Sequence, residues 1–481
     1  MDRSGLTESA GRHSAGNEAL PPIVAGRTLA ERLAARVALR IEQHALKPGT
    51  RLPSIRKFAL GEGVSRSTVV ESYDRLIAAG LIESRRGSGF YVSARPALAP
   101  ATPAPPAIDG GAVDVVWLLK SMLRQAPAVA QPGAGLLPPS WLDEQLIATA
   151  VRAVGRTAGA ALLSYGVPQG YPELREQLAR RLALFDIDAT PAQIVTTCGV
   201  TQGIDLVARH FVAPGDTVFV EDPAWFVMFA RLAAFGAKLV AVPRLADGPD
   251  LNVFANLLSR HQPRLFFVNS VLHNPTGASM AAATAHRLLK LAEQYKVTLV
   301  EDDVYGDLHP GKPMRLASLD QLKRVIYLGG FSKTLAAGLR VGFLAAPPDI
   351  TQQLADLKML TGLTTPELPE RAVARVLADG AYRRHVERVR GKLEAARART
   401  ARALEKMGVR FFGTAAHGMF LWSDFGRDTN AIAARGAQEG FLCAPGSLFS
   451  PTQLPSTWMR ISAATCLNPA ALRFLAREVD G

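Results

Sequence analysis

The chain has 481 residues, of which 48% are hydrophobic, and a formal net charge of +13. This length and composition are typical of two or more folded domains and argue against a disordered protein. The sequence contains no uncharged apolar run of about 18 residues, so no membrane span is expected, and the first 20 residues lack the apolar core of a signal peptide. Three cysteines, Cys198, Cys443 and Cys466, match no metal-binding spacing, so we expect no metal site and a reducing, cytoplasmic location.

The positive charge is concentrated near the N-terminus. Residues 27–95 contain 13 Lys and Arg against six Asp and Glu, a net charge of +7. A small basic domain joined to a more nearly balanced one favours a polyanionic partner for the small domain. Charge alone is equally consistent with a solubilising surface.

The first predicted elements are a tail and a helix. Residues 1–26 are mixed polar and small, which is typical of a disordered tail. Thr28 and Glu31 have the spacing of a capping box, and an apolar stripe follows them. A helix is therefore predicted from Thr28 to the segment Lys47-Pro48-Gly49.

Two further helices and a hairpin come next. Ser54 is placed to cap a helix reaching about Leu60, and Ser65 to cap another that ends near Gly80. Two short strands are predicted beyond it, with a basic turn between them. The strands cover residues 81–84 and 89–92, and the turn covers residues 85–88.

Three helices and a basic hairpin predict a winged helix-turn-helix, an α+β unit that binds double-stranded DNA. Its last helix enters the major groove, where Arg66 can form two hydrogen bonds with a guanine edge. Ser67 and Thr68 can contact phosphate or base. The remaining arginines are placed for phosphate or minor-groove contacts: Arg56 in the second helix, with Arg85 and Arg86 in the turn.

Three segments carry a family resemblance. Residues 48–56, 63–69 and 86–89 make residues 27–93 closely similar to the GntR family of winged-helix regulators. The resemblance implies that four residues contact operator DNA, namely Arg56, Arg66, Ser67 and Thr68. A winged helix used only for protein contacts is the alternative.

A different composition begins after the hairpin. Residues 94–112 are rich in Pro and Ala, which predicts an extended linker. In residues 113–481, short apolar runs alternate with amphipathic helical stretches, so a mainly parallel α/β sheet is expected. The predicted strands are residues 218–221, 238–242, 265–269, 298–302 and 325–328.

Lys333 follows the last of these strands, where α/β folds present active groups. A buried amine has a lowered pKa and can form a Schiff base with an aldehyde. Asp302, at the end of another strand, can supply the anion that the pyridinium nitrogen of pyridoxal 5′-phosphate requires. Taken singly, a surface lysine and a strand-end carboxylate are the simpler interpretations, but their joint occurrence indicates this cofactor.

Other residues complete the predicted cofactor site. Tyr305 and Asn274 can reach the ring hydroxyl, and Trp225 can stack on the ring. Arg340 can bind the phosphate through two hydrogen bonds, together with the loop before a helix at residues 197–203. In that loop Gly199, Val200 and Thr201 are the candidate residues. Each of these side chains also has a structural interpretation as core, turn or ion pair.

The order of these segments resembles the fold-type I aminotransferases over residues 113–481. The matching segments are residues 165–170, 274–277, 302–305, 332–340, which adds Ser332, and 458–462. The resemblance implies that Tyr165 reaches the cofactor phosphate of a neighbouring subunit and that Arg460 holds a substrate or effector carboxylate, hence a homodimer. Aminotransferases commonly place hydroxyl residues around the phosphate, whereas this chain has Cys198, Val200 and Gly330.

A GntR winged helix fused to such a domain resembles the MocR-like regulators. That resemblance implies a transcription regulator whose pyridoxal phosphate domain senses an amino acid, an amine or the cofactor itself. It also implies a dimer that exchanges DNA-binding heads. The alternative is an active aminotransferase with an accessory DNA-binding head, because the same residues permit transamination. A cofactor-free scaffold is a third possibility, which Lys333 and Asp302 oppose.

Overall fold

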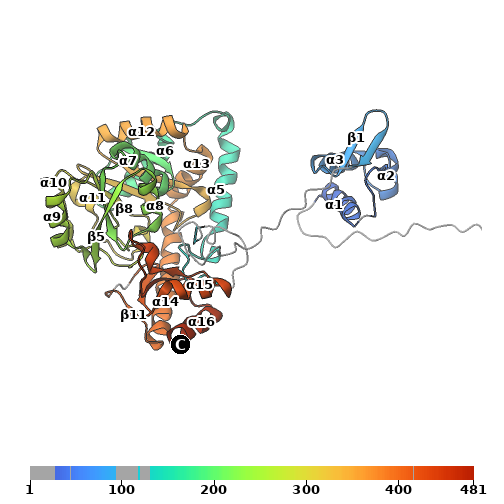
Figure 1. The fold of residues 1–481 in the computed structure, drawn as a ribbon. Coiled ribbons are helices and arrows are strands. Elements are labelled where there is room, and N and C mark those ends of the chain that lie inside the picture. Colours follow the sequence, from blue (N-terminus) through green and yellow to red (C-terminus); the bar gives the residue numbers. More distant parts are fainter. Residues whose placement is uncertain (1–27, 44, 94–117, 120–129, 415–416, 481) are drawn as a thin grey trace, which may run out of the picture. The chain divides into compact units, whose positions relative to one another are not determined.

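The computed structural model describes residues 28–43, 45–93, 118–119, 130–414 and 417–480. The chain divides into two compact units, Met1–Ala107 and Ile108–Gly481 (Figure 1). The predicted tail, and all of the predicted linker, lie outside the described residues. Within the described part, no helix is both long and apolar enough to span a membrane.

The first unit consists of three helices and a β-hairpin, as the sequence predicts. Helix α1 ends several residues before the segment Lys47-Pro48-Gly49, and the Ser88 N–H donates to the Arg85 carbonyl at 2.9 Å to close the hairpin turn. The elements are α1 (Leu29–Glu42), α2 (Ile55–Glu62), α3 (Arg66–Ala78), β1 (Ile82–Arg85) and β2 (Gly89–Val92).

Local capping and one buried tyrosine explain this small fold. The Thr28 hydroxyl accepts from the Glu31 N–H at 3.3 Å, and the Glu31 carboxylate accepts from the Thr28 N–H at 2.8 Å. Tyr73 of α3 is fully buried, its hydroxyl donates to the Pro53 carbonyl at 2.8 Å, and its ring contacts Phe58 and Phe90. Tyr73 therefore joins α3 to α2 and to the hairpin, in a core that also includes Leu33 and Val37 of α1.

The second unit is built on an eight-stranded sheet in the order β3-β10-β9-β8-β7-β4-β5-β6. The five strands predicted from the sequence are all present and pair in parallel. Strand β10 is antiparallel to both of its neighbours. The strands are β3 (Ile194–Cys198), β4 (Thr217–Asp222), β5 (Lys238–Leu245), β6 (Gly248–Pro249), β7 (Leu265–Val268), β8 (Thr298–Asp302), β9 (Val325–Gly330) and β10 (Val341–Ala345).

Helices cover both faces of this sheet. Successive residues of a strand face opposite sides, so each strand contributes to two cores. Leu299 packs into one core and Val300 into the other. The first core lies under α5 (Glu144–Thr157), α6 (Pro172–Ala183), α9 (Leu251–Arg260), α10 (Ala282–Gln294), α11 (Leu316–Asp320) and α13 (Glu367–Ala378). The second lies under α7 (Val200–Phe211), α8 (Phe226–Ala234) and α12 (Pro348–Gly362).

The long helix α14 (Ala381–Lys406) leads from these layers to a smaller antiparallel sheet (Figure 1). This sheet has the order β11-β12-β14-β13 and a third apolar core. The elements of this part of the chain are β11 (Arg410–Phe411), β12 (Phe420–Asp424), α15 (Thr429–Gln438), β13 (Ala444–Pro445), β14 (Trp458–Ser462) and α16 (Pro469–Asp480). Short 3-10 helices connect elements of this unit, among them η5 (Gly306–Leu308) and η6 (Ala337–Leu339).

Candidate functional site

Two neighbouring parallel strands bring Lys333 and Asp302 to the same edge of the large sheet. Asp302 is the last residue of β8, and Lys333 lies in the turn just after β9. In the β8–β9 ladder Asp302 pairs with Leu328. The carboxyl ends of adjacent parallel strands are where α/β proteins bind ligands.

Lys333 is half-buried, in surroundings that on balance disfavour the charge of its amine. Its Nζ donates to the Gly135 carbonyl at 2.8 Å and lies 5.8 Å from the centre of the Tyr305 ring. Burial lowers the pKa of Lys333 to about 8, and the positive charge of Arg460 acts in the same direction while Asp302 opposes it. A lysine with this pKa holds a useful fraction of neutral, nucleophilic amine near neutral pH.

The Asp302 carboxyl is shifted in the opposite sense. Burial raises its pKa to about 7, although the Val304 N–H donates to Oδ1 at 3.1 Å and Lys333 favours the charged form. A carboxylate that is shielded from water with so little compensation is stabilised by any cation that reaches it. The protonated nitrogen of a pyridine ring is such a cation.

A hydrogen-bonded chain links the large sheet to the small one. The Asn274 side-chain N–H donates to the Tyr305 hydroxyl at 3.2 Å, and Arg460 Nη1 donates to Asn274 Oδ1 at 3.0 Å. Arg460 Nη2 donates to the Gly133 carbonyl at 2.7 Å. Arg460 Nε is buried without a hydrogen-bond partner, so this guanidinium retains one unsatisfied donor beside the site.

The predicted phosphate loop connects β3 to α7. Gly199 has φ +73°, and a Cβ there would lie 2.6 Å from Arg340 Nη2. Glycine is therefore required for the close approach of Arg340, which donates to the Cys198 carbonyl at 2.9 Å. Val200 is buried and Thr201 half-buried at the first turn of α7, where free N–H groups favour an anion.

One buried amine near this loop was missed by the sequence analysis. Lys358 of α12 is 1% exposed, and its Nζ donates to the hydroxyls of Thr196 at 3.3 Å and Thr365 at 3.1 Å. Burial lowers its pKa to about 8. The signal was the helical spacing of Thr351, Leu354 and Lys358, which places this lysine on the buried face of α12.

The remaining predicted cofactor residues occupy different environments. Ser332, next to Lys333, is half-buried. Trp225 precedes α8 and packs against the core under α7 and α8. Tyr165 is 81% exposed, whereas Lys333 and Asp302 are half-buried. In a single chain, Tyr165 is therefore available to another molecule.

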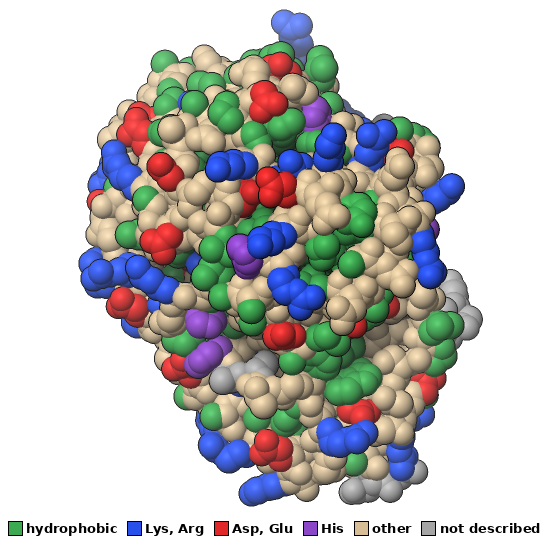
Figure 2. Space-filling view, turned by 90° about the vertical axis from the view of Figure 1, so that its left-hand side faces the viewer, with side chains coloured by type: hydrophobic (Ala, Val, Ile, Leu, Met, Phe, Trp, Pro, Cys, Tyr) green, Lys and Arg blue, Asp and Glu red, His purple; other side chains and the backbone are tan. Residues whose placement is uncertain are grey.

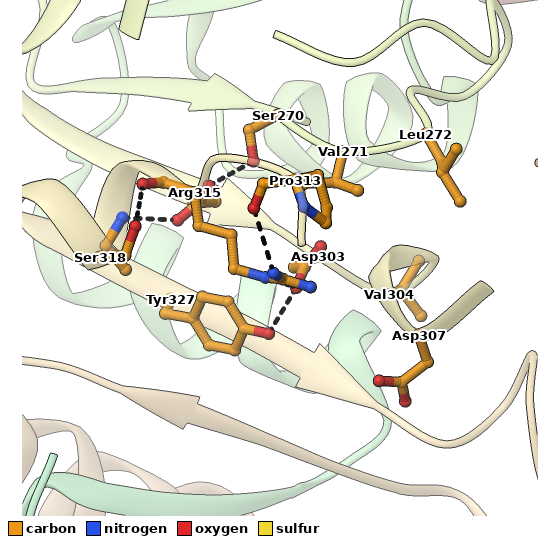
Figure 3. Close-up of polar contacts among 12 residues, drawn as sticks. Ser270, Val271, Leu272, Asp303, Val304, Asp307, Pro313, Arg315, Ser318 and Tyr327 are labelled. Atoms are coloured by element: carbon orange, nitrogen blue, oxygen red, sulfur yellow. Dashed lines mark hydrogen bonds and ion pairs between the residues drawn. The ribbon is translucent and has the colours of Figure 1, made fainter. Parts of the chain in front are cut away.

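A buried ionic network supports the strand ends from the other face of the sheet (Figure 3). Arg315 Nε and the Tyr327 hydroxyl both donate to Asp303 Oδ2, each at 2.6 Å. Glu301 accepts from the backbone N–H groups of residues 316 and 317, both at 2.8 Å, and from the Ser270 hydroxyl. These bonds fix β8 and β9 against α11.

The first unit presents a polar surface at the start of α3. Arg66 and Ser67 are exposed, and Arg56 is exposed on α2. The Ser65 hydroxyl, which caps α3, lies 2.7 Å from the hydroxyls of both Ser67 and Thr68. The two predicted hydroxyl contacts are thus held by the helix cap, while Arg66 projects from the same turn.

The hairpin arginines differ from each other. Arg85 Nη2 lies 2.7 Å from Glu83 Oε1, and its guanidinium stacks 4.5 Å from the centre of the Tyr91 ring. Arg86 is exposed. A DNA phosphate would have to share Arg85 with an existing ion pair, whereas such competition is not seen for Arg86 among the described contacts.

Comparison with known proteins identifies both units. Residues 29–92 match the bacterial regulatory proteins of the gntR family, and residues 137–479 match aminotransferase class I and II. The α-aminoadipate aminotransferase LysN from Thermus thermophilus, solved with N-(5′-phosphopyridoxyl)-L-leucine, has a TM-score of 0.70 and 28% identity. That similarity covers 76% of this chain and 94% of LysN. Fold and site thus define a winged helix-turn-helix regulator fused to an aminotransferase-like domain.

Relatives that are named as regulators match most of this chain. The probable rhizopine catabolism regulatory protein MocR of Rhizobium meliloti is 32% identical over 72% of this chain and 71% of its own length. The uncharacterized HTH-type transcriptional regulator YdcR of Escherichia coli is 29% identical over 91% of this chain and 94% of its own length. The chain belongs to the MocR-like subfamily of GntR transcription regulators.

Proposed function

We propose that the aminotransferase-like domain carries pyridoxal 5′-phosphate as a Schiff base on Lys333 and that a ligand at this site changes DNA binding by the head. The observation that carries the proposal is that Lys333, with its lowered pKa, and the half-buried Asp302 follow the ends of two adjacent parallel strands. When bound, the cofactor supplies an electron-withdrawing pyridinium ring and an imine carbon open to exchange with amines.

The residues around Lys333 fit this cofactor. Asp302 would pair with the ring nitrogen, and Tyr305 with Asn274 would hold the ring hydroxyl. Arg340 and the N-terminus of α7 would bind the phosphate, which the proximity of Arg340 and Gly199 supports. The other proposed contacts are Trp225 on the ring face and Ser332, Val200 and Thr201 near the phosphate.

Arg460 indicates the chemistry of the ligand. Arg460 is 1% exposed and keeps an unpaired Nε–H, which is costly unless a ligand satisfies it. A carboxylate is the group that a guanidinium binds best. The proposed effector is therefore an amino acid or an amine with an acid group, and free pyridoxal phosphate is a second candidate signal.

We propose that the working regulator is a homodimer in the cytoplasm, where operator DNA is available, with heads exchanged between subunits. The exposed ring of Tyr165 supports a role at the cofactor of the neighbouring subunit. In this proposal residues 27–93 bind DNA, residues 113–481 bind the effector and dimerise, and residues 94–112 link them. The DNA contacts are Arg56, Arg66, Ser67, Thr68, Arg85 and Arg86.

A second candidate function is transamination. The 2-aminoadipate transaminase of Thermus thermophilus is 30% identical over 71% of this chain and 87% of its own length. Asn274 and Arg460 are buried and hydrogen-bonded to each other, and the half-buried Lys333 interacts electrostatically with Arg460 and Asp302, so the chemistry is permitted. The DNA-binding head favours regulation as the role of this chain.

The deciding experiment is selection of bound fragments from a DNA library by the full-length protein, with and without a panel of amino acids and amines. We expect one enriched operator whose affinity changes with one acid-bearing amine, as linkage between two sites requires. Multiple-turnover transamination with an amine that leaves DNA binding unchanged would favour the enzyme instead. Absence of any enriched sequence would contradict the regulatory proposal.

A further inference from the structure

The excess positive charge of this chain is confined to two segments. Helix α14 contains nine Lys and Arg against three Asp and Glu, a net charge of +6. Residues 27–95 carry +7, so these two segments account for the whole formal excess of +13. On the face shown in Figure 2, basic and acidic side chains are interspersed. A single helix of the second unit therefore carries nearly as much excess charge as the entire DNA-binding head.

The charges of α14 are also separated by side of the helix. At 3.6 residues per turn, six exposed basic residues fall within a sector of about 80°. The three acidic residues, Glu387, Glu394 and Glu405, fall outside that sector, on the opposite side of the exposed face of the helix. We name the six residues the basic ridge: Arg384, Arg388, Lys392, Arg399, Arg402 and Lys406, all of them exposed.

The basic ridge is largely unneutralised by the protein itself. Arg388 forms an ion pair with Asp143 at 2.8 Å and remains 58% exposed. No other ridge residue forms an ion pair with the described part of the chain. Two of the acidic residues of α14 have partners outside the ridge. Glu387 Oε1 lies 3.7 Å from Arg383 Nε, and Glu394 Oε1 lies 3.7 Å from His417 Nδ1. Surface charge kept for solubility alone is normally mixed in sign along a helix.

The dimensions of the ridge match one kind of polyanion. From Arg384 to Lys406 the helix rises about 33 Å, and one turn of B-DNA is about 34 Å long. Duplex DNA carries one negative charge per about 1.7 Å of its axis. A row of cations of this length, of which only Arg388 has an ion-pair partner among the described residues, can therefore bind several phosphates along a single turn.

We propose that the basic ridge of α14 is a second, sequence-independent contact surface for duplex DNA. DNA held by the head of the same assembly is present at high effective concentration near the ridge, which makes weak individual contacts sufficient. The ridge adds affinity and salt dependence, and the head supplies the sequence preference. This inference rests on the DNA-binding head and not on the cofactor proposal.

The test uses the full-length protein and a duplex of mixed sequence, about 60 base pairs long, enough for several helical turns. The ridge variant carries Lys392→Gln, Arg399→Gln and Arg402→Gln, which leaves the Arg388 ion pair intact. A charge-matched control carries Arg180→Gln, Arg383→Gln and Arg473→Gln, three arginines off the ridge. Affinity is measured from about 50 to 200 mM salt, the range over which phosphate contacts are lost, with folding checked by circular dichroism.

Each lost phosphate contact reduces the slope of log affinity against log salt by about 0.9. For the ridge variant we expect a slope lower by about 2–3, so that between about 50 and 200 mM salt its affinity falls about 40-fold less than that of the native protein. The control should keep the native slope. If the triple variant does not fold, Lys392→Gln and Arg402→Gln are measured singly, each with an expected loss of about 0.9.

Two results would overturn the proposal. Equally reduced slopes for the ridge variant and the control would show that only net charge matters. A native DNA slope in the ridge variant, combined with weaker binding to phosphatidylglycerol vesicles, would assign the ridge to an anionic membrane surface. Neither result depends on whether Lys333 carries a cofactor, so this test and the test of the proposed function fail independently.

Discussion

Replacement of Gly330 by serine tests how the cofactor phosphate would be held. Gly330 is the last residue of β9, three residues before Lys333, and its φ lies outside the left-handed region. A Cβ there would lie 3.3 Å from Val200 Cγ2 and 3.5 Å from both Gly342 Cα and the Val341 carbonyl. A side chain therefore fits once the Val200 methyl group moves by a few tenths of an ångström.

The expected gain follows from the added donor. A hydrogen bond to a charged group contributes about 1.5–3 kcal/mol, or roughly a tenfold to hundredfold change in affinity. Gly330→Ala introduces the same Cβ without the hydroxyl, so the ratio of the two variants isolates the hydrogen bond from the contact with Val200. Pyridoxal phosphate titration of the apo protein, followed by absorbance, should show Gly330→Ser binding that much more tightly than Gly330→Ala.

Equal affinities of the two folded variants would refute this reasoning. That outcome would mean that the phosphate is already satisfied, by Thr201, by Tyr165 of a neighbouring subunit or by water. The idea that loose binding lets free pyridoxal phosphate act as a signal would then be wrong. Circular dichroism of both variants separates this outcome from a loss of folding.

Three further predictions concern the two sites. Borohydride should fix pyridoxal phosphate on Lys333, with labelling that rises with pH through about 8 as the amine becomes neutral; a label on Lys358, equally shifted but fully buried, would contradict the assignment. Arg66→Ala should cost about 1–3 kcal/mol at the selected operator and relax its sequence preference, whereas Arg85→Ala should weaken binding to all sequences alike; a uniform loss for Arg66→Ala would exclude base readout. Arg460→Ala should abolish both the spectral and the DNA-binding response to acid-bearing amines, and intact responses would locate the effector elsewhere.

The DNA-binding head was predicted almost completely because its signals are local. Thr28, Ser54 and Ser65 each cap the helix that the sequence assigned to them, since a cap depends on residues within one turn. Strand β8 was predicted with its observed ends, because a buried apolar run there is bounded by polar residues. Lys333 and Asp302 could be paired from the order of the segments and the family resemblance together.

Features that depend on distant pairing were not predicted. Strands β3 and β10 were missed, because the antiparallel insertion of β10 between β3 and β9 is decided by partners far away in the sequence. The strands β11 and β13 of the small sheet are two residues long and leave no pattern. The bond from Arg460 to Asn274 spans 186 residues, so no local signal contains it.

The network behind β8 also determines the register of the strand. Asp302 and Asp303 are adjacent, and consecutive residues of an extended chain point to opposite faces. A slip by one residue would exchange the two carboxylates, and a slip of this kind turns every side chain of the strand over. Asp303 is held by Arg315 and Tyr327, so the slipped arrangement would lose this ion pair. An anchor on one face thus selects which of two chemically identical carboxylates stands beside Lys333 on the other.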